Sequence, residues 1–164
     1  MKTTPVSLAA AFSATVLLSA CSAPGGAGRV AGELSLRDAA DAVQVEAAIE
    51  DYVLGFYDAE PDRLARVLSP DLVKLGYWRE SPDQDYSDVS SMSFEQALAL
   101  ASQWNADGQR GADMPYEITL FEVADKTAVG KLTAVWGQDY FLLSKSDGAW
   151  TIHQILWQSA PPAE

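Results

Sequence analysis

The chain has 164 residues, of which 48% are hydrophobic and 21% charged, and its formal net charge is −12. This length suits one domain, and the apolar fraction is sufficient for a core, which excludes disorder over most of the chain. The chain has only 11 basic residues but 23 acidic ones. We therefore expect no nucleic-acid partner, because phosphate backbones are bound by clustered Lys and Arg. One cysteine makes no internal disulfide and one histidine makes no multi-histidine metal site. We therefore expect no metal and no cofactor.

The start of the chain has the pattern of a bacterial export signal. Lys2 precedes an uncharged apolar run over residues 6–18, which is too short to span a bilayer as a stable helix. Small residues follow, and their junction with Cys21 resembles the lipobox, whose cysteine is acylated before cleavage. We predict a lipoprotein signal peptide over residues 1–20 and lipidation at Cys21. The alternative is an ordinary secreted protein with a free or buried thiol.

Lipidation would make the membrane a partner of the mature protein. Each buried methylene of an acyl chain contributes about 0.8 kcal/mol, so several chains anchor a protein stably. Residues 21–37 are rich in Gly and Ala and predict a flexible tether. Ser22, rather than an aspartate, follows the cysteine. By resemblance to lipoprotein sorting in Gram-negative bacteria, we expect the cell envelope, at the outer membrane and facing the periplasm.

Hydrophobic spacing predicts a domain over residues 38–158, followed by a tail over 159–164. Its first helix carries an apolar stripe with period 3.6, formed by Val45, Ile49, Tyr52, Val53 and Phe56.

Two shorter helices are expected after the first. Pro61 suits the first turn of the second helix, and Pro70 is expected to end it. Ser93 and Gln96 have the spacing of a capping box at the start of the third helix. Trp104 lies on the apolar face of that helix, near its end.

The second half of the domain changes to extended segments rich in β-branched and aromatic residues. Strands are predicted at about 72–78, 116–123, 127–136, 138–145 and 149–158. The pair Asp147-Gly148 between the last two is a strong hairpin signal. Three helices followed by these strands indicate an α+β fold in which the helices pack on a curved antiparallel sheet.

These segments also carry a family resemblance. The run from Lys126 to Trp157 resembles the C-terminal half of the putative lumazine-binding proteins, a branch of the nuclear transport factor 2-like (SnoaL-like) superfamily. The run from Val43 to Trp78 is similar to the start of the same domain. The resemblance implies a cone-shaped α+β fold around an apolar cavity. The superfamily includes isomerases, cyclases, dehydratases and binding members, so the fold alone does not choose the function.

A cone of this kind would be lined by aromatic and a few polar side chains. Trp150 alternates with Ile152 and is expected in the core. His153 has a pKa range suited to acid–base work, or is an ordinary strand histidine on the surface. Lys74 and Lys131 are expected to be surface charges. The candidate pocket residues are Tyr57, Trp78, Trp104, Trp136, Asp139, His153 and Trp157.

The resemblance also suggests an acid–base pair, as in ketosteroid isomerases, where an aspartate acts opposite a tyrosine hydroxyl. Asp139 or Asp71 with Tyr57 would be such a pair. Asp139 and Tyr140 are strand neighbours, so their side chains point to opposite faces.

Two functions follow. The first, which we favour, is a non-catalytic, membrane-anchored module that binds a small apolar or heteroaromatic ligand or a protein partner. The second is an isomerase or dehydratase acting on a small carbonyl compound. The sequence leaves homodimer formation open.

Overall fold

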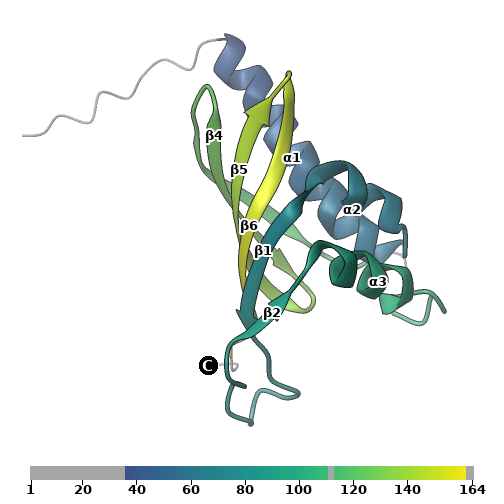
Figure 1. The fold of residues 1–164 in the computed structure, drawn as a ribbon. Coiled ribbons are helices and arrows are strands. Elements are labelled where there is room, and N and C mark those ends of the chain that lie inside the picture. Colours follow the sequence, from purple (N-terminus) through teal and green to yellow (C-terminus); the bar gives the residue numbers. More distant parts are fainter. Residues whose placement is uncertain (1–35, 111–112, 162–164) are drawn as a thin grey trace, which may run out of the picture. The chain divides into compact units, whose positions relative to one another are not determined.

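The computed structural model describes residues 36–110 and 113–161, which form three helices and one six-stranded sheet (Figure 1). The helices pack on the sheet as predicted for an α+β fold. Cys21, the signal peptide and nearly all of the predicted tether lie outside the described residues. No helix in the described ranges is both long and apolar enough to cross a membrane.

The helices bury the stripe that the sequence predicts. α1 (Leu36–Tyr57) places Val45, Ile49, Tyr52, Val53 and Phe56 in the core. α2 (Pro61–Val67) ends before Pro70, because the backbone is already extended at Leu68.

α3 (Phe94–Trp104) begins with the predicted capping box. The Ser93 Oγ accepts a hydrogen bond from the Gln96 backbone N–H, and the Gln96 Oε1 accepts one from the Ser93 N–H at 2.8 Å.

The sheet has the strand order β2-β1-β6-β5-β4-β3. Its strands are β1 (Leu68–Tyr77), β2 (Ser90–Met92), β3 (Glu117–Val123), β4 (Thr127–Ala134), β5 (Gly137–Ser146) and β6 (Ala149–Ser159). The expectation of an antiparallel sheet is wrong at one position, since β1 pairs with β6 in parallel. A hairpin turn forces neighbouring strands to be antiparallel, but the long connection from β1 to β6 leaves the direction free. The short strand β2 was not predicted.

The predicted hairpin between β5 and β6 is present. Ser146 pairs with Ala149, and the two residues between them have positive φ angles, 51° at Asp147 and 83° at Gly148. Both angles match a two-residue turn of the type that Asp-Gly favours.

A β-bulge in β6 decides which side chains reach the inner face. The register of β6 against β5 skips one residue, His153. Before the bulge the inward residues are Trp150 and Ile152, and after it they are Ile155 and Trp157. The inward positions thus change from even to odd numbers. Without this shift, Trp157 would point away from the helices.

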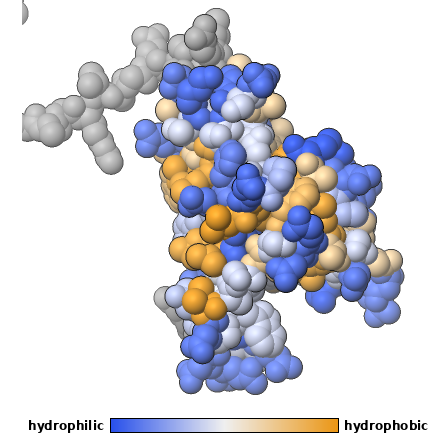
Figure 2. Space-filling view, in the orientation of Figure 1, coloured by the Kyte–Doolittle hydropathy of each residue, from blue (hydrophilic) through white to orange (hydrophobic). Residues whose placement is uncertain are grey.

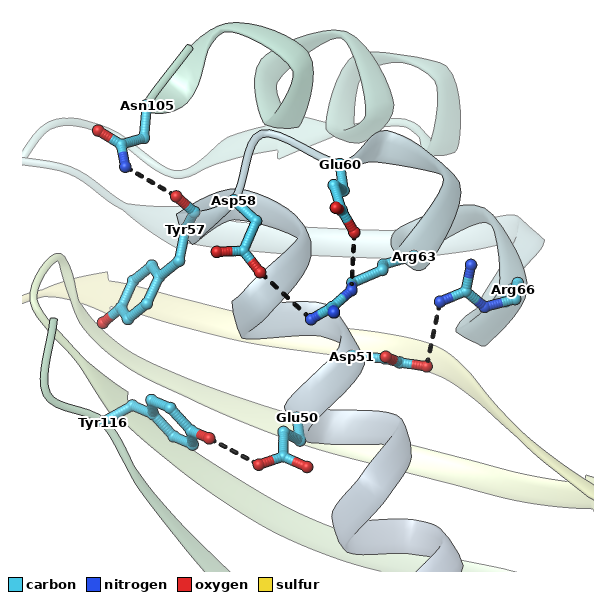
Figure 3. Close-up of polar contacts among 9 residues, drawn as sticks. All are labelled: Glu50, Asp51, Tyr57, Asp58, Glu60, Arg63, Arg66, Asn105 and Tyr116. Carbon is cyan, nitrogen blue, oxygen red and sulfur yellow. Dashed lines mark hydrogen bonds and ion pairs between the residues drawn. The ribbon is translucent and has the colours of Figure 1, made fainter. Parts of the chain in front are cut away.

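Polar contacts fix the ends of the helices to the rest of the domain (Figure 3). The Asn105 side chain, after α3, donates to the carbonyl of Tyr57 at the end of α1, with 2.7 Å between the atoms. Arg63 of α2 pairs with two carboxylates at the turn before it. The Tyr116 hydroxyl donates to Glu50 at 2.6 Å, and this bond raises the pKa of Tyr116 to about 12.

Apolar and hydrophilic residues occupy different parts of the surface. On the face shown in Figure 2, apolar residues gather across the middle, and hydrophilic residues occupy the upper and lower ends.

Candidate functional site

A pocket of about 810 Å³ lies at one end of the sheet. It is bordered by the end of α1, α3, the turn between β4 and β5, and the C-terminal ends of β1 and β6. Its aromatic and methionine lining consists of Tyr52, Phe56, Trp78, Met92, Trp104, Met114, Trp136 and Trp157. A largely apolar pocket with a few polar groups is the usual form of a small-molecule site.

Trp136 is the centre of the aromatic wall. Its ring meets the ring of Trp104 edge-on, with 5.2 Å between the ring centres, and that of Phe56 at 5.5 Å. Behind Trp104, the Tyr57 ring stacks at 5.7 Å with an interplanar angle of 15°. These contacts hold the tryptophans in fixed orientations, which reduces the entropy lost when a flat ligand binds.

The opposite wall depends on a glycine. The Trp157 ring packs directly on Gly76 of β1, where a Cβ atom would come within 2.2 Å of the indole. Any larger residue at this position would push Trp157 out of its place.

A buried polar cluster forms the floor of the pocket. Lys74 of β1 donates to the Tyr52 hydroxyl at 2.5 Å, and the Tyr52 hydroxyl donates to Asp139 Oδ1 at 3.2 Å. The Lys74 Nζ lies 3.5 Å from the same carboxylate oxygen. The other oxygen, Oδ2, accepts from the Trp136 indole N–H at 2.6 Å. Asp139 therefore ties the floor of the pocket to its wall.

Burial controls the protonation of this cluster. Loss of hydration raises the pKa of Tyr52 well above its ordinary value, and the charge of Asp139 adds to the effect. The phenol consequently remains a protonated donor. Desolvation lowers the pKa of Lys74, while Asp139 acts in the opposite direction. The carboxylate of Asp139, 3.5 Å from Nζ, and the Tyr52 hydroxyl that accepts from Nζ both favour the charged ammonium form.

The members of the cluster differ in their access to the pocket. Lys74 and Tyr52 are among the lining residues, whereas Asp139 is not, and both of its oxygens already accept hydrogen bonds. The carboxylate can orient Tyr52 and Trp136, but it is not placed to take a proton from a ligand.

The predicted pocket residues fall into three groups. Trp78, Trp104, Trp136 and Trp157 line the pocket together. Asp139 lies beneath the lining, in the floor cluster. Two residues are not among the lining.

Those two are Tyr57 and His153. Tyr57 is buried behind Trp104, where its hydroxyl donates to the Pro115 carbonyl at 2.9 Å and accepts from the Val135 N–H. His153 is exposed and hydrogen-bonds to Ser144. It follows the inward-pointing Ile152 and is the residue skipped at the bulge, so its side chain lies on the outer face of β6.

The expected acid–base pair is not formed as predicted. Tyr57 contacts neither aspartate through its hydroxyl, and Asp71 is exposed. The hydroxyl that meets Asp139 belongs to Tyr52, five residues before the predicted position. As expected, Asp139 and Tyr140 point to opposite faces.

Several lining residues were missed or misplaced by sequence reasoning. Lys74 was expected on the surface but is only 6% exposed. Its alternation with Leu72 and Gly76, both buried, was an available signal. Lys131, the other expected surface lysine, is half-buried. Nothing local distinguished Arg79 and Arg110, which enter the lining from loops.

Within the described ranges, no group of three or more His, Cys, Asp or Glu residues is arranged to hold a metal ion.

Fold and pocket together define a class. The helices on a bent sheet are those of the nuclear transport factor 2-like fold, which three solved structures share. They come from Silicibacter pomeroyi DSS-3 (16% identity, TM-score 0.60, covering 74% of this chain and 97% of that one), Methylobacillus flagellatus KT (17%, 0.55, 77% and 95%) and Shewanella baltica OS155 (12%, 0.54, 75% and 96%). Each is described as a protein of unknown function.

Within this class the family is also shown. Residues 40–158 match the family described as "Putative lumazine-binding", and the chain belongs to that family. No curated protein matches the chain.

Proposed function

We propose that this protein is a lipid-anchored envelope protein whose cone domain binds a small planar ligand without converting it. The observation that carries the proposal is the pocket of about 810 Å³ with four tryptophans in its lining, two of which, Trp104 and Trp136, are held in place by other aromatic side chains. Flat rings stack on such walls, and each Å² of apolar surface removed from water contributes about 25 cal/mol. The family name adds heteroaromatic compounds such as lumazine to the candidates.

The state of Asp139 supports a non-catalytic role. A general base must come within hydrogen-bond reach of the proton that it removes. Asp139 is fully buried, and its oxygens are taken by Tyr52 and Trp136. The cluster therefore favours a structural and recognition role.

A second candidate is an isomerase or dehydratase acting on a small carbonyl compound. It is favoured by Tyr52, a residue of the pocket lining whose hydroxyl is hydrogen-bonded to both Lys74 and Asp139. If this hydroxyl turned its O–H from Asp139 to the ligand, it would stabilise a developing enolate.

The lipid anchor at Cys21 is part of the proposal and rests on the lipobox-like junction alone. By the same sequence argument, the domain would face the periplasm from the outer membrane.

Titration of intrinsic tryptophan fluorescence with lumazine and other flat heteroaromatic compounds tests the binding function. We expect a saturable signal with micromolar affinity, because a few hundred Å² of apolar burial outweighs the cost of association. Trp104→Leu or Trp157→Leu should weaken binding at least tenfold. Phe121→Leu is the matched control, since that side chain is 57% exposed on β3 and is not part of the pocket lining.

Binding and turnover measurements on the wild-type protein distinguish the two candidate functions. If no compound gives a saturable signal, and the wild type turns over a small ketone in a reaction that Tyr52→Phe abolishes, the binding function is wrong and the enzyme replaces it.

A further inference from the structure

Cations are concentrated in the pocket of an otherwise acidic chain. The whole sequence has 23 acidic and 11 basic residues. Among the charged side chains that line the pocket the ratio is reversed, with Lys74, Arg79 and Arg110 against Glu80. A pocket that gathers positive charge in a negative protein favours an anionic ligand over the many neutral molecules of similar shape.

Two of these cations are placed by aromatic rings. The Arg110 guanidinium lies 4.6 Å from the centre of the Trp104 ring, and Arg79 lies 4.6 Å from that of Tyr86. Arg79 also donates to the carbonyl of Ala160, at the end of β6. Both guanidinium groups thus lie against aromatic rings at the border of the pocket, with Arg79 buried and Arg110 exposed.

Lys74 is the cation at the floor. Its Nζ lies 5.2 Å from the ring centre of Tyr52, 5.7 Å from that of Phe56 and 5.5 Å from that of Trp157. These three rings shield the ammonium from water at the inner end of the pocket. A charge in such a place interacts more strongly with an opposite charge than it would at the surface.

The donors of Lys74 are not all used within the described part of the chain. An ammonium has three N–H groups. Among the described residues, Lys74 meets the Tyr52 hydroxyl and one oxygen of Asp139, so two acceptors serve three donors. The side chain is 6% exposed and lines the pocket, so an acceptor on a ligand bound there can reach the ammonium.

Asp139 does not remove the need for such a partner. Its carboxylate already receives hydrogen bonds from two neutral donors, the Tyr52 hydroxyl and the Trp136 indole, and its nearest approach to the ammonium is 3.5 Å. The negative charge of Asp139 is thus shared among three groups. A ligand oxygen at ordinary hydrogen-bond distance from Lys74 would be a closer partner for the ammonium than Asp139 is.

We propose that the pocket selects planar aromatic acids: ligands with a flat ring that stacks on the tryptophans and a negatively charged oxygen group that contacts Lys74. The inference rests on the proposed binding function and adds to it the chemical class of the ligand. Lys74 provides the specificity, and the tryptophans provide most of the buried area.

The test compares naphthalene-2-carboxylate with naphthalene-2-carboxamide, which have the same ring and nearly the same shape but differ in charge. Tryptophan fluorescence at pH 7 gives both affinities. We expect the wild type to bind the carboxylate at least tenfold more tightly. Lys74→Met should weaken binding of the carboxylate at least tenfold and that of the carboxamide less than threefold. Lys126→Met, in the exposed turn between β3 and β4, removes the same charge from the chain and should change neither affinity.

Removal of Lys74 leaves a buried carboxylate, which can unfold the domain. The double variant Lys74→Met with Asp139→Asn contains no such charge and is measured in parallel, with circular dichroism to verify the fold. Loss of the carboxylate preference in either folded variant supports the inference.

Two results overturn it. Equal affinity of the wild type for the two compounds, or a preference that survives in the folded Lys74 variants, refutes the selection of acids while the binding function stands. No saturable binding of either compound, nor of lumazine, refutes the binding function and the inference together.

Discussion

Trp150 differs from the other four tryptophans because it does not line the pocket. Its side chain is 5% exposed, and its indole N–H points to Asp41 Oδ1 at 3.4 Å. Trp150→Ala should lower the free energy of unfolding by about 3 to 5 kcal/mol, the usual cost of removing a large buried aromatic side chain. Urea denaturation measures the loss. Trp78→Ala is the control and should cost less than about 1 kcal/mol, because Trp78 is 52% exposed.

Single residues also show what the sequence could predict of the site. The four pocket tryptophans could be proposed because each is a large aromatic residue on a predicted element or at its end. The floor cluster could not, because 87 residues separate Tyr52 from Asp139. Lys74 looks like a surface charge until its partner is known, since a lysine is rarely buried unless it is paired. Only the three-dimensional fold supplies that partner.

Among the elements, β6 shows most clearly which features the sequence pattern predicts and which it does not. Alternation correctly placed Trp150 and Ile152, and the helix stripe and the Asp-Gly hairpin are also confirmed. The position of a bulge, however, depends on how two strands pair, which the pattern of one strand does not contain. The parallel pairing of β1 with β6 is likewise a choice between distant segments.

The exposed position of His153, the bulged residue of β6, leads to a second prediction. Because the residue is exposed and outside the pocket lining, His153→Ala should change the affinity for a planar ligand by less than twofold and the unfolding free energy by at most about 0.5 kcal/mol. Fluorescence titration and urea denaturation measure the two quantities. A loss of binding beyond tenfold would show that the histidine reaches the ligand.

For the whole molecule, the proposed anchor gives a separate prediction. Cys21→Ala removes the sulfur that acylation requires, so the protein should leave the membrane fraction or remain unprocessed. Fractionation and the mass of the purified protein measure both effects, and Ser22→Ala serves as the control for a neighbouring substitution. A Cys21→Ala protein that fractionates and migrates like the wild type would show that the lipoprotein prediction is wrong.

The place of β6 in the sheet also orders the folding of the domain. β6 is the last strand among the described residues, yet it lies between β1 and β5 and joins the first half of the domain to the second. A nascent chain that ends before Ala149 has no strand with which to link β1 to the β3–β5 segment, and pairing of such distant segments is intrinsically slow. The domain therefore completes its core only after nearly all of its residues have been made. Under the proposed export to the cell envelope, this delay would keep the chain open to the export machinery until its final strand emerges.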